Sequence, residues 1–79
     1  TAAALAGTRR VEAGRVGERP APTGEARCPY TLVVGSASIA RPMIECVSRP
    51  VWARAVVGGP VTLTLVAGPF GAEVAEVGP

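Results

Sequence analysis

Apolar and polar residues alternate along much of residues 28–79, with the period of two expected of β-strands. The clearest segment is residues 61–65, in which Val61, Leu63 and Leu65 share one face and two threonines share the other. Similar alternation predicts further strands at residues 30–34, 43–47, 51–57 and 73–77. We therefore expect an all-β fold, a small antiparallel sandwich or barrel of about five strands.

Glycine and proline lie between these segments, where the chain must turn. The Gly58-Gly59 pair predicts a tight hairpin that joins residues 51–57 to residues 61–67. The regular spacing of such turns supports the all-β interpretation.

The chain has only 79 residues, and its two cysteines, Cys28 and Cys46, could form a disulfide that stabilises so small a domain. A domain of this size rarely gains more than ~3–5 kcal/mol from its core, and a disulfide across this separation would add ~3 kcal/mol. An antiparallel hairpin of residues 30–34 and 43–47 places the two cysteines opposite each other, on the face of Leu32. We expect a disulfide and hence a secreted protein, extracellular or in the cell envelope; two buried thiols are the alternative.

Composition changes near Cys28, and the change predicts two parts. Residues 1–27 hold five arginines and three glutamates, which account for the net charge of +2, but few large apolar side chains. We expect them to form an extended arm, rich in arginine, alanine, glycine and proline, outside a domain formed by residues 28–79. In such an arm, the side chains available to anchor it on a neighbouring molecule are Val11, Ala13 and Val16.

Histidine, aspartate, lysine, asparagine and glutamine are all missing from the chain. Nucleophilic catalysis therefore lacks an imidazole base, and the glutamates offer one close pair, Glu73 and Glu76. Two cysteines without histidine or aspartate do not predict a zinc or calcium site. We expect no enzymatic activity, no metal and no cofactor.

The longest uncharged stretch, residues 55–72, is interrupted by glycines and prolines, so it does not predict a membrane-spanning helix. Nucleic acid is also disfavoured as a partner, because glutamates offset the arginines of the arm and the arm has no aromatic side chain for stacking. The expected partner is a protein, most simply another copy of the chain.

Two classes of function remain. The first is a secreted structural subunit that self-assembles, into a filament or an envelope assembly, through its arm and by β-strand addition at its sheet edges. The second is a secreted binding module, such as a protease inhibitor, that presents the disulfide-closed loop 35–42 with Arg41 near its tip. An accessory subunit of a larger complex is a further alternative. Trp52 is expected to anchor the core or, failing that, an interface.

Overall fold

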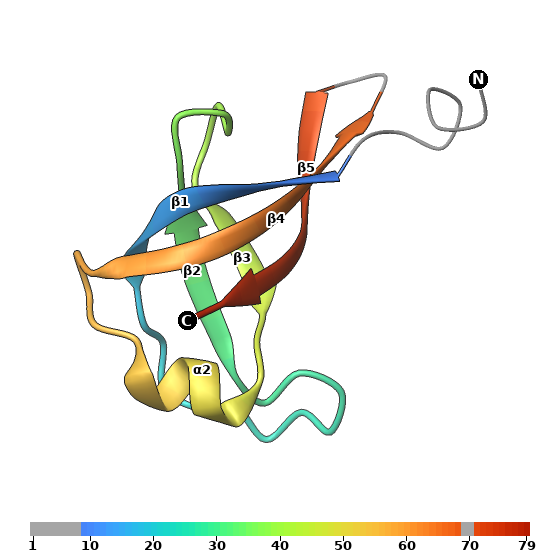
Figure 1. Ribbon diagram of the computed structural model, residues 1–79. Helices are drawn as coiled ribbons and strands as arrows, with labels where there is room; N and C mark the ends of the chain where they lie inside the picture. The colour runs from blue at the N-terminus through green and yellow to red at the C-terminus, as the bar shows by residue number, and fades with distance from the viewer. Residues whose placement is uncertain (1–8, 69–70) are drawn as a thin grey trace.

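The computed structural model describes residues 9–68 and 71–79, which form one antiparallel sheet with a short helix (Figure 1). The elements in chain order are β1 (Arg9–Glu18), β2 (Thr31–Gly35), β3 (Met43–Cys46), α2 (Arg49–Arg54), β4 (Pro60–Gly68) and β5 (Gly71–Gly78). Their order across the sheet is β3-β2-β1-β4-β5, and all neighbouring pairs are antiparallel. The expected all-β fold of five antiparallel strands is confirmed.

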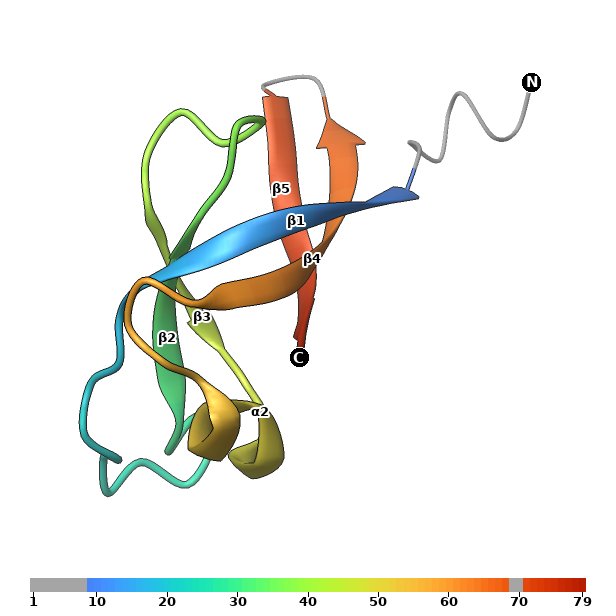
Figure 2. The ribbon, with the colours of Figure 1, turned by 60° about the vertical axis from the view of Figure 1, so that its left-hand side comes forward.

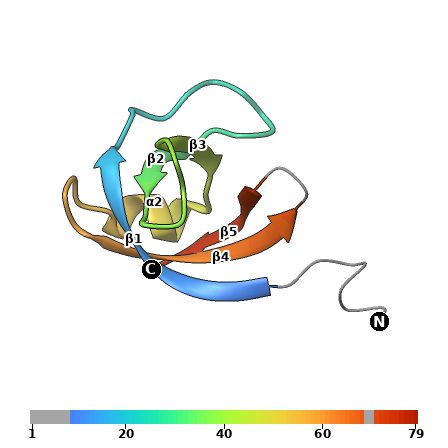
Figure 3. The same ribbon diagram turned by 90° about the horizontal axis from the view of Figure 1, so that it is seen from above.

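The sheet is coiled into a nearly closed barrel. In Figures 1 and 2, β1 and β4 run across the direction of β2 and β3, and Figure 3 shows the strands curving round rather than lying flat. The edge strands are β3 and β5, and no pairing joins them within the described ranges. This strand order, with a helix between the third and fourth strands, is the connectivity of the OB-fold, a partly open five-stranded Greek-key barrel. A topology does not assign a function.

The barrel interior is filled by aliphatic side chains from four strands. The buried set is Val16, Leu32, Val34, Val61, Leu63, Leu65 and Val77. In β4 the inward positions alternate with threonines that are only partly buried, as the sequence predicts. The strands expected at residues 30–34, 43–47 and 73–77 are confirmed as β2, β3 and β5, with ends that differ by at most two residues.

The position of β1 corrects the expectation of an arm outside the domain. Residues 9–18 lie in the middle of the sheet, paired with β4 from Arg9↔Val66 to Arg15↔Pro60 and with β2 on the other side. The low apolar content of this segment does not indicate a central strand, because its inward positions include Glu12 and Gly14 and its apolar contribution to the core is Val16. Residues 1–8 of the expected arm lie outside the described residues.

Residues 51–57 do not form the expected strand. Their first part belongs to α2, in which the side chain of the N-cap Ser48 accepts a hydrogen bond from the Val51 amide and Pro50 occupies the first turn. Val51, Trp52 and Ala55 of this segment pack against the core, a spacing that suits one helix face. A short apolar run does not distinguish helix from strand by period alone.

The glycine turn expected at Gly58 is present, with a φ of +82° at this residue. It connects α2 to β4 instead of two paired strands, so the hairpin expected between residues 51–57 and 61–67 is wrong. The amide of Gly58 donates to the Val16 carbonyl at 2.7 Å, which fastens the turn to β1.

The disulfide between Cys28 and Cys46 is confirmed, with a Cα–Cα distance of 5.6 Å. The register expected around it is wrong, because Thr31, and not Cys28, pairs with Cys46. Cys28 precedes β2, and Cys46 lies on the opposite face of the sheet from Leu32. The bridge therefore ties the β1–β2 connection to the end of an edge strand.

Candidate binding groove

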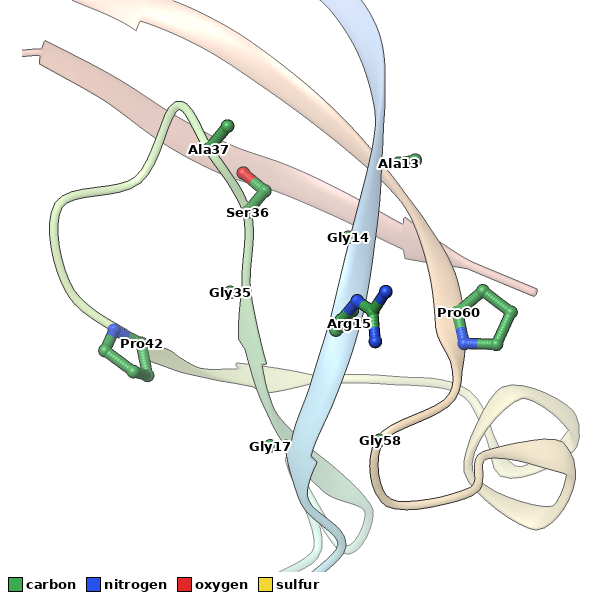
Figure 4. A pocket seen from close by; sticks show the side chains of 10 residues that line it. All are labelled: Ala13, Gly14, Arg15, Gly17, Gly35, Ser36, Ala37, Pro42, Gly58 and Pro60. Atoms are coloured by element: carbon green, nitrogen blue, oxygen red, sulfur yellow. The ribbon is translucent and has the colours of Figure 1, made fainter.

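A groove of about 710 Å³ lies on the outer face of the barrel, beside the loop between β2 and β3. Figure 4 shows its lining, which comes from β1, the end of β2, that loop, the turn between α2 and β4, and the start of β4. The residues are Ala13, Gly14, Arg15, Gly17, Gly35, Ser36, Ala37, Pro42, Gly58 and Pro60. Nearly all of them are small or are prolines, so the groove is a place where the sheet surface lacks side chains.

The strand register explains why these residues meet. Arg15 pairs with Gly35 on one side and with Pro60 on the other, so the three form a row across the sheet. Ala13 and Gly17 flank Arg15 along β1 on the same outward face. Arg15 thus projects from a floor of small residues (Figure 4).

Gly14 brings the floor of the groove close to the core. A Cβ atom at this position would lie 2.7 Å from Leu63 Cδ1 and 3.0 Å from the Gly35 carbonyl oxygen. The contact with Leu63 is too short for a Cβ atom and the contact with the Gly35 carbonyl is tight, so glycine suits the place where β1 passes over Leu63. Gly35 differs, because a Cβ there would meet nothing within 4 Å and would project into open space.

Arg15 is the only charged residue in the lining of the groove. In the described part of the chain its guanidinium makes no ion pair or side-chain hydrogen bond; the ion pair found there joins Arg10 to Glu12. Val11 and Ile44 continue the outward faces of β1 and β3 and are 69% and 71% exposed. An unpaired cation therefore lies among small residues, with exposed aliphatic side chains on the same face of the sheet.

A polar cluster fixes the β2–β3 loop that forms one wall of the groove. Ser38 donates from its hydroxyl to Glu12 Oε1 at 2.6 Å and from its amide to Oε2 at 3.2 Å. Arg10 donates to the Ser38 hydroxyl at 2.6 Å and lies 3.9 Å from the Glu12 carboxylate. These contacts hold the β2–β3 loop to Glu12 of β1, a residue that is distant from the loop in sequence.

The pKa of Glu12 lies below its ordinary value because of this cluster. The largest cause is the neighbouring Ser36 hydroxyl, followed by the hydrogen bond from Ser38, with a smaller contribution from the charge of Arg10. The Ser36 hydroxyl is buried and makes no hydrogen bond of good geometry within the described residues, so its effect on the carboxylate comes from proximity. The serines of the β2–β3 loop therefore stabilise the ionised form of Glu12.

Acidification is expected to loosen the loop. A folded-state pKa below the unfolded value stabilises the folded state above the ordinary value of 4.5, and this contribution is lost as the pH falls through the folded pKa. Amide exchange at Ser38, followed by NMR between pH 6 and pH 3, should accelerate beyond its intrinsic pH dependence as Glu12 protonates. In the Glu12→Gln variant this additional acceleration of amide exchange should be absent. The same acceleration in the wild type and the variant would contradict the role assigned to Glu12.

Trp52 is held within the domain by the connection between β1 and β2. The Arg19 guanidinium lies 3.6 Å from the centroid of the Trp52 ring, and Arg19 Nε donates to the Trp52 carbonyl at 2.9 Å. The indole Nε1 donates to the Pro20 carbonyl at 2.9 Å, and the ring of Tyr30 lies 5.4 Å away. These contacts place Trp52 at the edge of the core, the first of the two roles expected for it.

The other residues singled out in the sequence are dispersed. Val16 is 1% exposed in the core, so it is not an anchor for a neighbouring molecule, whereas Val11 and Ala13 do face outward. Arg41 is exposed on the β2–β3 loop, next to the groove residue Pro42. The loop from residue 35 to residue 42 does border the groove, so the structure brings the predicted loop and part of the predicted arm together.

Arg15 and the glycines around it were missed in the sequence. Each glycine resembles an ordinary turn residue, and Arg15 is one of five arginines before Cys28. The signal that separates them is strand pairing, because only the register places Gly35 and Pro60 on either side of Arg15.

Comparisons with known proteins give no further guide: no family model, curated protein or solved structure matches the chain. Among the described residues, no helix is long and apolar enough to cross a membrane. In the same ranges, no three acidic, histidine or cysteine residues are grouped so that they could hold a metal ion.

Proposed function

We propose that the protein is a secreted, non-catalytic binding module whose outer groove receives a segment of a partner protein. The observation that carries the proposal is the groove itself, about 710 Å³ in volume, walled by the β2–β3 loop and floored by glycine and alanine. This volume falls within the ~300–1,000 Å³ common for ligand sites. The disulfide suits an oxidising compartment, which supports secretion.

The chemistry of the groove favours binding over catalysis. Its lining includes one arginine and one serine, Arg15 and Ser36, but no carboxylate, thiol or imidazole that could serve as a base. No aromatic residue lines it for base stacking, which argues against single-stranded nucleic acid. Proline, glycine and alanine instead permit close approach of another polypeptide backbone.

Self-assembly through a donated arm has less support than the sequence alone suggested. Residues 9–18 are paired with strands on both sides, so they would have to leave their own sheet to reach a neighbour. Glu45, on the edge strand β3, pairs with the buried Leu32 and faces the interior side, where burial raises the pKa of its carboxyl. An inward charge on an edge strand opposes further strand pairing, and the register shift between β4 and β5 has the same effect at the other edge.

The proposal is tested by filling the groove. Gly35→Val adds a side chain where nothing lies within 4 Å, so the fold should persist while the groove is blocked. Peptides selected on the wild-type protein from a phage-displayed library of random twelve-residue sequences should bind Gly35→Val at least about tenfold more weakly.

The matched control is Gly24→Val, because Gly24 is equally open but does not line the groove. This variant should bind the selected peptides like the wild type. Recovery of no binding peptide, or equal binding by Gly35→Val, would reject the groove as the binding site. Light scattering on the same samples checks self-association, and concentration-dependent growth that Gly35→Val leaves unchanged would favour assembly elsewhere on the surface.

A further inference from the structure

We infer that the groove recognises an extended peptide segment whose central residue carries a carboxylate, held by Arg15. The inference rests on the proposed function and adds the chemistry of the ligand. Its starting point is that Arg15 is the only charged residue of the lining and, within the described ranges, has no ion-pair partner.

The acidic residues of β1 do not neutralise Arg15. Glu12 has the opposite parity along the strand, is partly buried and is engaged by Ser38 and Arg10. Glu18 follows the irregularity in β1 and is paired with Val33, and no ion pair joins it to Arg15 in the described structure. Arg41, on the loop that walls the groove, adds a second positive charge near its rim. The local charge therefore favours an anion.

A guanidinium is suited to bind a carboxylate in particular. Its planar donors match the two oxygens of a carboxylate in a bidentate pair, and such charge-assisted hydrogen bonds are stronger than neutral ones. At Arg15 the neighbouring positions across the sheet are a glycine and a proline, so no side chain crowds the approach from Gly35. The cation is accessible without first breaking an internal contact.

The shape of the site favours an extended segment. The outward residues of β1 from Ala13 to Gly17 span roughly 13 Å at ~3.3 Å per residue, which is the length of about four extended residues. Beyond this span, Val11 lies exposed at one end, and the partly buried Val33 lies beside Gly17 at the other. A ligand with apolar residues on either side of its acidic residue would contact aliphatic side chains at both ends.

The test is a reversal of charge. Random twelve-residue phage-displayed peptides are selected in parallel on the wild-type protein and on Arg15→Glu, and the surviving sequences are compared. The wild type should enrich peptides with an acidic residue between apolar ones, and Arg15→Glu should lose this enrichment and favour basic residues. For the strongest wild-type peptide made synthetically, replacing its acidic residue by the amide should weaken binding about tenfold or more, with a smaller difference at high salt.

Arg27→Glu is the matched control, because it makes the same change in net charge on an exposed residue of the β1–β2 connection that does not line the groove. It should keep the acidic preference, so a loss equal to that of Arg15→Glu would overturn the assignment to Arg15 and indicate a general charge effect. Peptides that are sensitive to Gly35→Val but show no acidic preference would overturn this inference and leave the proposed function standing. Peptides insensitive to both variants would overturn both.

Discussion

Replacing Leu63 by alanine is expected to lower the free energy of unfolding by about 2–5 kcal/mol. Leu63 is fully buried at the centre of β4, and its side chain fills the space beneath Gly14. Since a core of this size supplies only ~3–5 kcal/mol and the disulfide adds ~3 kcal/mol, the variant should stay folded without denaturant but unfold at a much lower urea concentration than the wild type. Urea titration followed by the fluorescence of Trp52, the one tryptophan in the chain, measures the change.

Ile44→Ala is the control for the loss of a large aliphatic side chain. Ile44 is 71% exposed on an edge strand, so its replacement should change the free energy of unfolding by less than about 1 kcal/mol. A cost for Ile44→Ala comparable to that for Leu63→Ala would mean that the outer face is covered in solution, for example by a second copy. A small change in the free energy of unfolding for Leu63→Ala would contradict the placement of Leu63 in the core.

Removal of the disulfide is the second large effect. The double replacement Cys28→Ser and Cys46→Ser should lower the free energy of unfolding by ~3 kcal/mol, because the bridge restricts the unfolded chain across its separation of 18 residues. The effect should appear as a lower urea midpoint. Treatment of the wild type with a thiol reductant should give a similar shift.

The native structure without the bridge should retain its local contacts around Trp52. The β1–β2 connection is also held by Arg19 and Pro20, which do not depend on the cysteines. The double variant should therefore keep the wild-type tryptophan emission under native conditions and differ in the midpoint of unfolding. An unchanged midpoint in both the double variant and the reduced protein would contradict a stabilising role for the bridge.

The sequence predicted those strands whose own pattern alternates. Val61, Leu63 and Leu65 face the core as expected, because every second residue of β4 is a large aliphatic one. β1 was not predicted as a strand of the sheet, since its outward positions and its glycines carry no such pattern and its place depends on partners far away in sequence. Residues 51–57 were expected to form a strand because a short apolar run fits either element, and the N-cap Ser48 and the first-turn Pro50 decide in favour of a helix at Arg49–Arg54.

Less of the candidate site could be predicted. The loop from residue 35 to residue 42 was singled out because the two cysteines enclose it, and it does wall the groove. The floor of the groove could not be predicted from the sequence. It is formed where Gly17 and Gly35 lack side chains, and the strand register that brings these glycines beside Arg15 has no local sequence signal. Such a site follows from pairing between strands and from no local motif.

The central position of β1 also governs how the domain can be made. Arg9 pairs with Val66, so β1 is synthesised before one of its two neighbours, β4, from which it is separated in sequence by β2, β3 and α2. Closing so long a loop costs entropy before any contact compensates, and all-β chains of this kind typically fold in milliseconds to seconds. Until then β1 has an open edge and is exposed to wrong pairing, and Arg9, Arg10 and Glu12 near its start are charges that discourage such pairing.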